Sequence, residues 1–286
     1  MSFTEIRLPT LRGELAALRD GNPDGPKLLA LHGWLDNAAS FIPLLPQFAG
    51  FDVVALDLPG HGHSAHRLPG YDYAFIDWLH DVLDAMDALG WPRAHLLGHS
   101  LGGAIASCVA ACVPERVQRL ALIEALGPLA GAPGESGERL RTALRARRER
   151  GAREDSEPRR IDNIDVALAA RLAATPMPRE AARLIVERNL RPVDGGYVWR
   201  SDARLTLPSA VRLPEDAVQA ILRQITLPTF LVAAEPSPPY FSAEIRDARR
   251  GCVADIRVLT LPGGHHIHME QPELVGGMLA DFLAAP

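Results

Sequence analysis

Residues 95–103 have the sequence HLLGHSLGG, and the prediction of the fold starts from them. Residues 98–102 within it fit the pattern G-x-S-x-G, with an apolar run before them and small apolar residues after them. A strand, a tight turn and a helix in that order hold a serine hydroxyl at the tip of the turn, where it can act as a nucleophile. A glycine turn with an incidental serine is the alternative. If the serine is a nucleophile, the chain must also supply a base, an acid and oxyanion donors. The remaining sequence therefore tests this interpretation.

Composition indicates a large soluble protein. The chain has 286 residues, of which 47% are hydrophobic, and this is enough for a sizeable core. A net charge of −5 predicts no general attraction to nucleic acid or to anionic membranes. Three cysteines argue against a disulfide framework. The N-terminus lacks the pattern of a signal peptide, and no run reaches the roughly 18 apolar residues of a membrane span. We therefore expect a cytoplasmic protein without a membrane span.

Short apolar runs bounded by glycine or proline alternate with helical patterns, which predicts an α/β fold with a mostly parallel sheet. The expected strands are residues 27–31, 51–58, 94–97, 119–123, 229–233 and 256–261. The expected helices are residues 73–89, 101–113 and 272–283. Residues 3–8 and 14–18 have no helix between them, so an antiparallel hairpin is expected at the sheet edge.

The alternation stops in the middle of the chain. We expect residues 1–127 and 225–286 to form the core domain, and residues 128–224 to form a helical insertion resting on it. Residues 139–150 carry six arginines and one glutamate. This stretch is either an ordinary solvated helix face or a docking surface for an acidic partner, such as an acyl carrier protein that presents a thioester.

A serine needs a base to take its proton, and residues 262–272, PGGHHIHMEQP, supply candidates after the last expected strand. His265 follows the glycine pair and is the predicted base, with His266 and His268 as alternatives. A histidine cluster also suggests a metal. No aspartate, glutamate or cysteine set converges with these histidines by spacing, so no metal site is expected.

Two glutamates could orient the histidine, because each directly follows an expected strand between the serine and the histidine. They are Glu124 in LALIEALGP and Glu235 in FLVAAEPSPP.

The oxyanion donors are expected from two segments. Residues 31–34, LHGW, turn at His32 and Gly33 so that the Trp34 amide can face the site. The Leu101 amide is the second expected donor. His32, Gly33 and His99 are expected to line the substrate position.

Taken together, LHGW, DLPGHGHS, GHSLGG and GGHHIHMEQP resemble the α/β-hydrolase superfamily across nearly the whole chain. Within it, LHGWLDNAASF, RLALIEALGP and DGGYVWRSDARLTLPS are similar to the serine hydrolase-like proteins. The resemblance implies an eight-stranded, mostly parallel sheet with a helical cap inserted after strand six. It also implies a hydrolase that needs no cofactor and is usually tested on esters, without specifying the substrate.

One departure from the family concerns the acid. In many relatives the catalytic aspartate follows strand seven, and that register falls on Ser237 here. Some members carry the acid at the end of strand six, which matches Glu124. The expected function is therefore a serine hydrolase that cleaves an ester or thioester with Ser100, His265 and Glu124, with Glu235 as the alternative acid. The missing acid at Ser237 favours the other class, a non-catalytic binding protein on a hydrolase scaffold.

Overall fold

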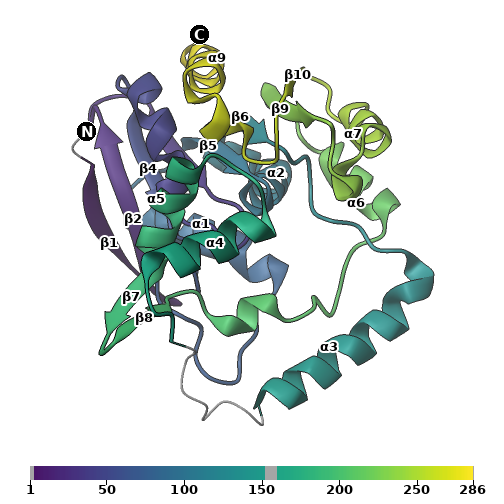
Figure 1. Cartoon of the computed structure of the whole chain (residues 1–286). Helices are drawn as coiled ribbons and strands as arrows, with labels where there is room; N and C mark the ends of the chain where they lie inside the picture. The colour runs from purple at the N-terminus through teal and green to yellow at the C-terminus, as the bar shows by residue number, and fades with distance from the viewer. Residues whose placement is uncertain (1–2, 152–159, 286) are drawn as a thin grey trace.

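An eight-stranded sheet forms the centre of the chain in the computed structural model, which describes residues 3–151 and 160–285 (Figure 1). Six neighbouring strands are parallel, and the two at one edge form an antiparallel hairpin that pairs with them. The predicted fold class and edge hairpin are confirmed. In spatial order the strands are β1 (Thr4–Thr10), β2 (Gly13–Gly21), β4 (Asp52–Leu56), β3 (Lys27–Leu31), β5 (Ala94–His99), β6 (Val117–Ile123), β9 (Thr229–Glu235) and β10 (Ile256–Pro262).

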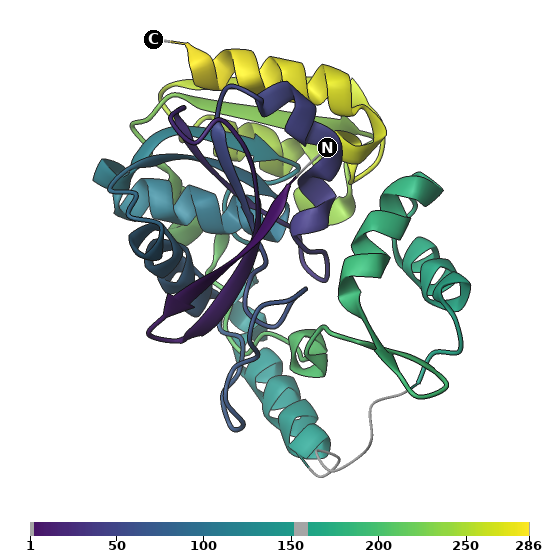
Figure 2. The ribbon, with the colours of Figure 1, turned by 90° about the vertical axis from the view of Figure 1, so that its left-hand side faces the viewer.

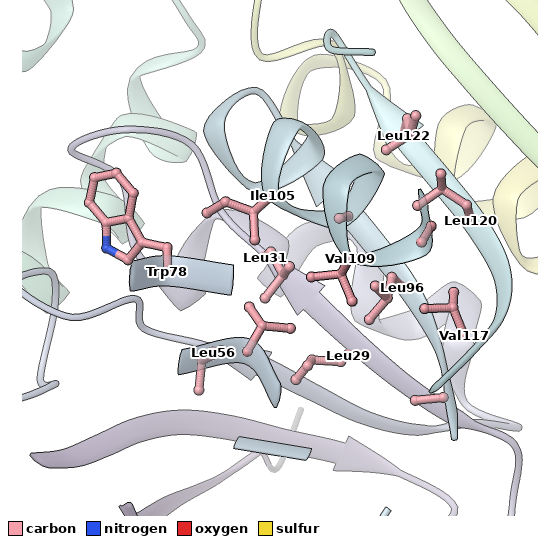
Figure 3. Packing of buried hydrophobic residues seen from close by; sticks show 14 of the residues in the cluster. Leu29, Leu31, Leu56, Trp78, Leu96, Ile105, Val109, Val117, Leu120 and Leu122 are labelled. Carbon is pink, nitrogen blue, oxygen red and sulfur yellow. The ribbon is translucent and has the colours of Figure 1, made fainter. Parts of the chain in front are cut away.

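Helices cover both faces of the sheet, which is why the central strands are apolar along their whole length. One face packs on α1 (Phe75–Ala88) and α2 (Leu101–Cys112), and the other on η1 (Ala38–Phe48) and α9 (Pro272–Ala284). Figure 3 shows the first face, where side chains of α1 and α2 meet those of the strands. The labelled residues there are Trp78, Ile105 and Val109 from the helices and Leu29, Leu31, Leu56, Leu96, Val117, Leu120 and Leu122 from the strands.

The strand register brings the carboxyl ends of the central strands to one edge of the sheet. Leu31 of β3 pairs with Gly98 of β5, and Gly98 pairs with Leu122 of β6. Ile123 at the end of β6 pairs in turn with Val232 of β9. Residues that directly follow these strands are therefore neighbours.

The segment between β6 and β9 is mainly helical, with one hairpin. Its elements are η3 (Pro133–Glu135), α3 (Ser136–Gly151), α4 (Ile164–Ala174), α5 (Arg179–Asn189), β7 (Leu190–Val193), β8 (Gly196–Trp199), η4 (Ala203–Thr206) and α6 (Glu215–Leu222). Figure 2 shows α4, α5 and the hairpin as a group beside the sheet, and they bury a small apolar cluster of their own. Helix α3 extends away from the sheet (Figure 1). Helix α6 instead packs on α2 through Val218 and Leu222.

The remaining short elements connect the strands: η2 (Pro114–Arg116), η5 (Pro239–Phe241), α7 (Ala243–Arg250) and α8 (Ile267–Glu270). None of the helices in residues 3–151 and 160–285 has both the length and the apolar character that crossing a bilayer requires.

Candidate active site

Ser100 occupies the strained turn between β5 and α2. Its backbone has φ 51° and ψ −113°, a region that non-glycine residues seldom adopt. Its amide donates to the Ile123 carbonyl, with N and O 3.0 Å apart, which ties the turn to the end of β6. The turn needs small neighbours, because a Cβ at Gly102 would collide with the backbone of Leu31. Strain of this kind persists where the surrounding structure enforces it, and it often marks function.

His265 lies between Ser100 and Glu124. Its Nε2 is 2.9 Å from Ser100 Oγ, and its Nδ1 is 3.1 Å from Glu124 Oε2. Glu124 is only 2% exposed and also has a positive φ, 56°. The Ala234 amide of β9 donates to the other carboxylate oxygen, Oε1. The carboxylate is thus held on both oxygens and faces the imidazole.

Glu235, the other candidate acid, lies away from this cluster. Its side chain is about half exposed; Ser237 Oγ donates to its Oε2 over 3.2 Å, and Arg246 lies 3.6 Å from the same oxygen. Ser237, at the register of the usual family acid, also accepts a hydrogen bond from Arg246. The structure therefore brings Glu124, and neither Glu235 nor Ser237, to His265.

The two expected oxyanion donors come from different elements. Leu101 directly follows the serine as the first residue of α2, and Trp34 lies in the loop after β3. The Gly102 amide donates to the His32 carbonyl, with N and O 3.0 Å apart, so this loop is fixed to the helix start. Neither the Trp34 nor the Leu101 amide donates to another described residue. Both amides are thus free to donate to a bound oxygen.

His32 and His99 have no exposed surface from which to contact a substrate, contrary to the sequence-based expectation. His32 accepts from the Leu58 amide at Nε2 and lies 2.7 Å from the Gly33 carbonyl at Nδ1. His99 Nε2 lies 2.8 Å from the His265 carbonyl oxygen. Burial lowers the pKa of His32 and holds that of His99 well below its usual value, so both rings are neutral. These two side chains position loops.

Gly33, the third residue expected to line the substrate position, is buried. A Cβ at this position would lie 2.9 Å from His99 Nδ1, so a larger residue does not fit there.

Tyr240 is part of the site, although no motif or spacing in the sequence singles it out. Its hydroxyl oxygen lies 3.2 Å from His265 Nδ1, the same nitrogen that faces Glu124. Its ring meets the His265 ring edge-on, with centroids 5.7 Å apart. Burial and the nearby Glu124 carboxylate raise the pKa of Tyr240 to about 12, so the phenol stays protonated near neutral pH.

A buried ionic cluster adjoins His265. The Asp36 carboxylate lies 2.9 Å from His266 Nε2, 3.7 Å from His99 Nδ1 and 2.6 Å from an Arg171 nitrogen. Burial opposes ionisation of Asp36, but His266 and Arg171 outweigh it and hold its pKa well below the usual value. A carboxylate therefore does converge with these histidines in three dimensions. Sequence spacing gave no signal for this contact, because 230 positions separate Asp36 from His266.

Helix α5 is also fixed to the loops that follow β3 and β4 by buried polar contacts. Arg188 donates to Asp57 after β4, with nitrogen–oxygen distances of 3.0 and 2.7 Å. The Asn37 side chain donates to the Ile185 carbonyl over 2.8 Å. Asn37 is next to Asp36, so the loop after β3 contacts α4 and α5.

Comparisons with known proteins agree with this architecture. Residues 26–272 match the family model described as the alpha/beta hydrolase fold. The chain is 31% identical to a serine hydrolase-like protein of Danio rerio, over 98% of this chain and 88% of that protein. It is 29% identical to a 2-(acetamidomethylene)succinate hydrolase of Mesorhizobium japonicum, over 91% of this chain and 89% of that protein. The crystal structure of a hypothetical protein from Pseudomonas aeruginosa PAO1 superimposes with a TM-score of 0.91 and 40% identity, and the match covers 100% of both chains.

Proposed function

This chain belongs to the α/β-hydrolase superfamily, and we propose that it is a serine hydrolase that cleaves a carboxylic ester or thioester through an acyl-enzyme on Ser100. The observation that carries the proposal is the pair of contacts at His265. Nε2 faces the Ser100 hydroxyl at 2.9 Å, and Nδ1 faces the buried Glu124 carboxylate at 3.1 Å. A base within hydrogen-bond reach of a nucleophile, and itself oriented by a third group, is the arrangement that activates serine.

In the proposed reaction, Ser100 Oγ attacks the substrate carbonyl carbon while His265 Nε2 takes the hydroxyl proton. Glu124 holds the Nδ1–H tautomer and stabilises the imidazolium that forms. The amides of Trp34 and Leu101 donate to the oxyanion. When the tetrahedral intermediate collapses, the bond to the leaving group breaks, and His265 returns the proton to the departing alcohol or thiol. Water, deprotonated by the same imidazole, then attacks the acyl-enzyme and releases the acid and Ser100.

The strained backbone supports the same assignment. The non-glycine residues with positive φ, among those the structure describes, are Leu35, Ser100 and Glu124. Two of them carry the proposed nucleophile and acid, and the third lies in the loop that holds Trp34. Strain concentrated at one edge of a sheet is typical of a preorganised active site.

Hydrolysis of p-nitrophenyl esters from acetate to palmitate tests the proposal, together with labelling by a fluorophosphonate probe. We expect the wild type to be labelled and active. The Ser100→Ala variant should lose labelling and at least about 10⁴-fold in kcat. The Ser209→Ala variant, which changes an exposed serine, is the matched control and should behave as wild type. A wild type that takes no label and cleaves no ester would favour the non-catalytic binding protein.

Helix α3 favours a more specific version, a thioesterase that acts on an acidic carrier protein. The helix extends away from the sheet (Figure 1). Its Leu140 and Leu144 are exposed and stand among arginines in the sequence. Arg139, Arg141 and Arg147 pair with acidic residues, whereas Arg145, Arg148 and Arg150 are exposed and pair with none of the described residues.

Reversing the charge of Arg145, Arg148 and Arg150 together tests carrier docking. The triple glutamate variant should lower turnover of a carrier-linked thioester and leave that of a small p-nitrophenyl ester unchanged, because only the carrier would contact α3. Equal loss on both substrates would contradict docking.

A further inference from the structure

The cluster around Asp36 contains two hydrogen-bond acceptors that face each other without a donor between them. His99 Nε2 lies 2.8 Å from the His265 carbonyl, so Nε2 carries the proton and donates it. Nδ1 of this neutral ring therefore presents a lone pair. That lone pair is 3.7 Å from Asp36 Oδ2, which is also an acceptor, and no described residue donates to it. Two buried acceptors face each other with no proton between them.

His266 Nε2 lies 2.9 Å from Asp36 Oδ2 and 3.2 Å from an Arg171 nitrogen. In the tautomer with the proton on Nε2, this N–H donates to the carboxylate; in the tautomer with the proton on Nδ1, the Nε2 lone pair is available to a cation. Nδ1 has no partner among the described residues. Unmet hydrogen-bonding groups in a buried site are costly.

A cation at this point would bind the Asp36 carboxylate and the His99 Nδ1 lone pair, and the Nδ1–H tautomer of His266 would supply a third ligand atom. Asp36 lies in the loop after β3, His99 at the end of β5 and His266 in the turn before α8. All three are buried, and their ligand atoms lie within 4.8 Å of one another. We propose that these three atoms form a binding site for a borderline-soft divalent cation of the Zn²⁺ type, which takes the place of the Arg171 guanidinium. Two imidazoles and one carboxylate are a donor set that zinc accepts, whereas Mg²⁺ and Ca²⁺ require mostly oxygen.

The surroundings of His99 suit a metal ligand. A ligating histidine usually donates its other ring N–H to a carbonyl or carboxylate, which fixes the ring and directs the lone pair at the ion. His99 donates to the His265 carbonyl in this way. His268, fully buried beside it with ring centroids 4.3 Å apart, has neither nitrogen bonded to a described residue.

Occupancy by an ion has a predictable consequence for the proposed active site. Arg171 belongs to α4, so an ion that replaces it releases one contact between the sheet domain and α4. The ion also binds two histidines that adjoin His265. His266 follows it in sequence, and His99 contacts its carbonyl oxygen. Metal loading is therefore expected to lower hydrolase activity.

Titration with Co²⁺, whose visible absorption reports nitrogen and oxygen ligands in a low-coordinate site, tests the proposal without relying on activity. We expect a visible band that saturates at one ion per chain. The His266→Asn variant should lose the band. The His63→Asn/His66→Asn double variant, which changes partly exposed histidines outside the cluster, should keep it. Near-ultraviolet circular dichroism establishes that each variant is folded.

Arg171 provides a second test with a defined sign, because it competes with the ion for the same carboxylate. The Arg171→Gln variant removes a positive charge 2.6 Å from Asp36 and should bind Co²⁺ at least about tenfold more tightly than wild type. The Arg171→Lys variant keeps the charge and should show no such gain. The proposal is overturned if Arg171→Gln binds Co²⁺ no better than wild type, or if the band persists in His266→Asn.

Discussion

Glu124 Oε2 lies 3.1 Å from His265 Nδ1, at the end of the strand next to the one that carries Ser100. The strand beyond it, β9, provides the Ala234 amide that holds the other carboxylate oxygen. In this chain β9 therefore supports the proposed acid instead of carrying it. The longer glutamate side chain suits this arrangement, since it must reach His265 from β6.

Replacing Glu124 with glutamine tests this relationship. The change removes the negative charge and puts an amide N–H where an acceptor is needed, so the imidazolium loses its stabilising partner. We expect kcat on a p-nitrophenyl ester to fall about 10²-fold or more. The matched Glu235→Gln variant changes a half-exposed carboxylate that contacts Arg246 and should retain activity within about twofold. The acid assignment is wrong if Glu235→Gln is the damaging change.

The sequence predicted the central strands well because their signal is local. Runs such as residues 27–31 and 229–233 are continuously apolar and end near glycine, proline or a charged residue. Elements whose sequence lacks the usual helical pattern were missed. Two prolines, Pro43 and Pro46, lie inside η1 (Ala38–Phe48). The buried residues of α7 (Ala243–Arg250) are charged instead of apolar. Arg249 is 3% exposed and pairs with Glu215, a partner no local pattern reveals.

The residues of the site that belong to sequence motifs could be predicted. The residues that join the site only through tertiary contacts could not. Ser100 and His265 follow from their glycine-flanked turns. Glu124 and Glu235 both end parallel strands, so position alone could not separate them. The positive φ of Glu124 and its contact with the Ala234 amide distinguish the two only in three dimensions. Tyr240 and Asp36 were missed because each meets its histidine only through the fold.

Tyr240 is expected to act as a positioning residue for His265. Its neutral hydroxyl shares the Nδ1 proton with Glu124, and one such hydrogen bond contributes about 1 kcal/mol. The Tyr240→Phe variant keeps the ring and should lower kcat about fivefold. It should also lower the apparent pKa of the acid limb of the kcat/KM profile, because the imidazolium loses a partner. The Tyr71→Phe variant changes an exposed tyrosine and serves as control. An unchanged pH profile in Tyr240→Phe would contradict the assignment.

Arg188 is expected to contribute strongly to the stability of the whole chain. Its side chain is 8% exposed, and the Asp57 side chain it meets is fully buried. Removing one partner of a buried ion pair leaves an uncompensated charge, which costs about 3 to 5 kcal/mol. The Arg188→Met variant should lose that much free energy of unfolding in a urea titration. The Arg179→Met variant breaks an exposed pair with Asp165 and should lose less than about 1 kcal/mol. Similar losses of unfolding free energy in both variants would contradict the expectation that the buried pair contributes more to stability than the exposed one.

Buried histidines predict a steep loss of stability in weak acid. Burial lowers the pKa of each of five rings in the folded chain, to about 4 for His95 and about 3 for His61. In the unfolded chain the same rings titrate near their ordinary value of about 6.5. The unfolded state therefore binds more protons as the pH falls below about 6.5, and the stability present above that pH is lost. The five histidines are His32, His61, His95, His99 and His268.

The size of this effect follows from linkage. A histidine that stays neutral in the folded state at about pH 5, as His61 and His95 do, costs about 2 kcal/mol there, so these two alone remove a substantial part of the stability of an ordinary domain. We expect the urea midpoint to fall sharply between about pH 7 and pH 5. The His95→Gln variant, at the start of β5 and away from Ser100, should lessen the accompanying fall in the free energy of unfolding by about 2 kcal/mol. The His80→Gln variant changes an exposed ring and should leave the pH dependence unchanged. A wild-type midpoint that stays flat over this range would mean that the rings gain their protons without unfolding, and the burial argument would fail.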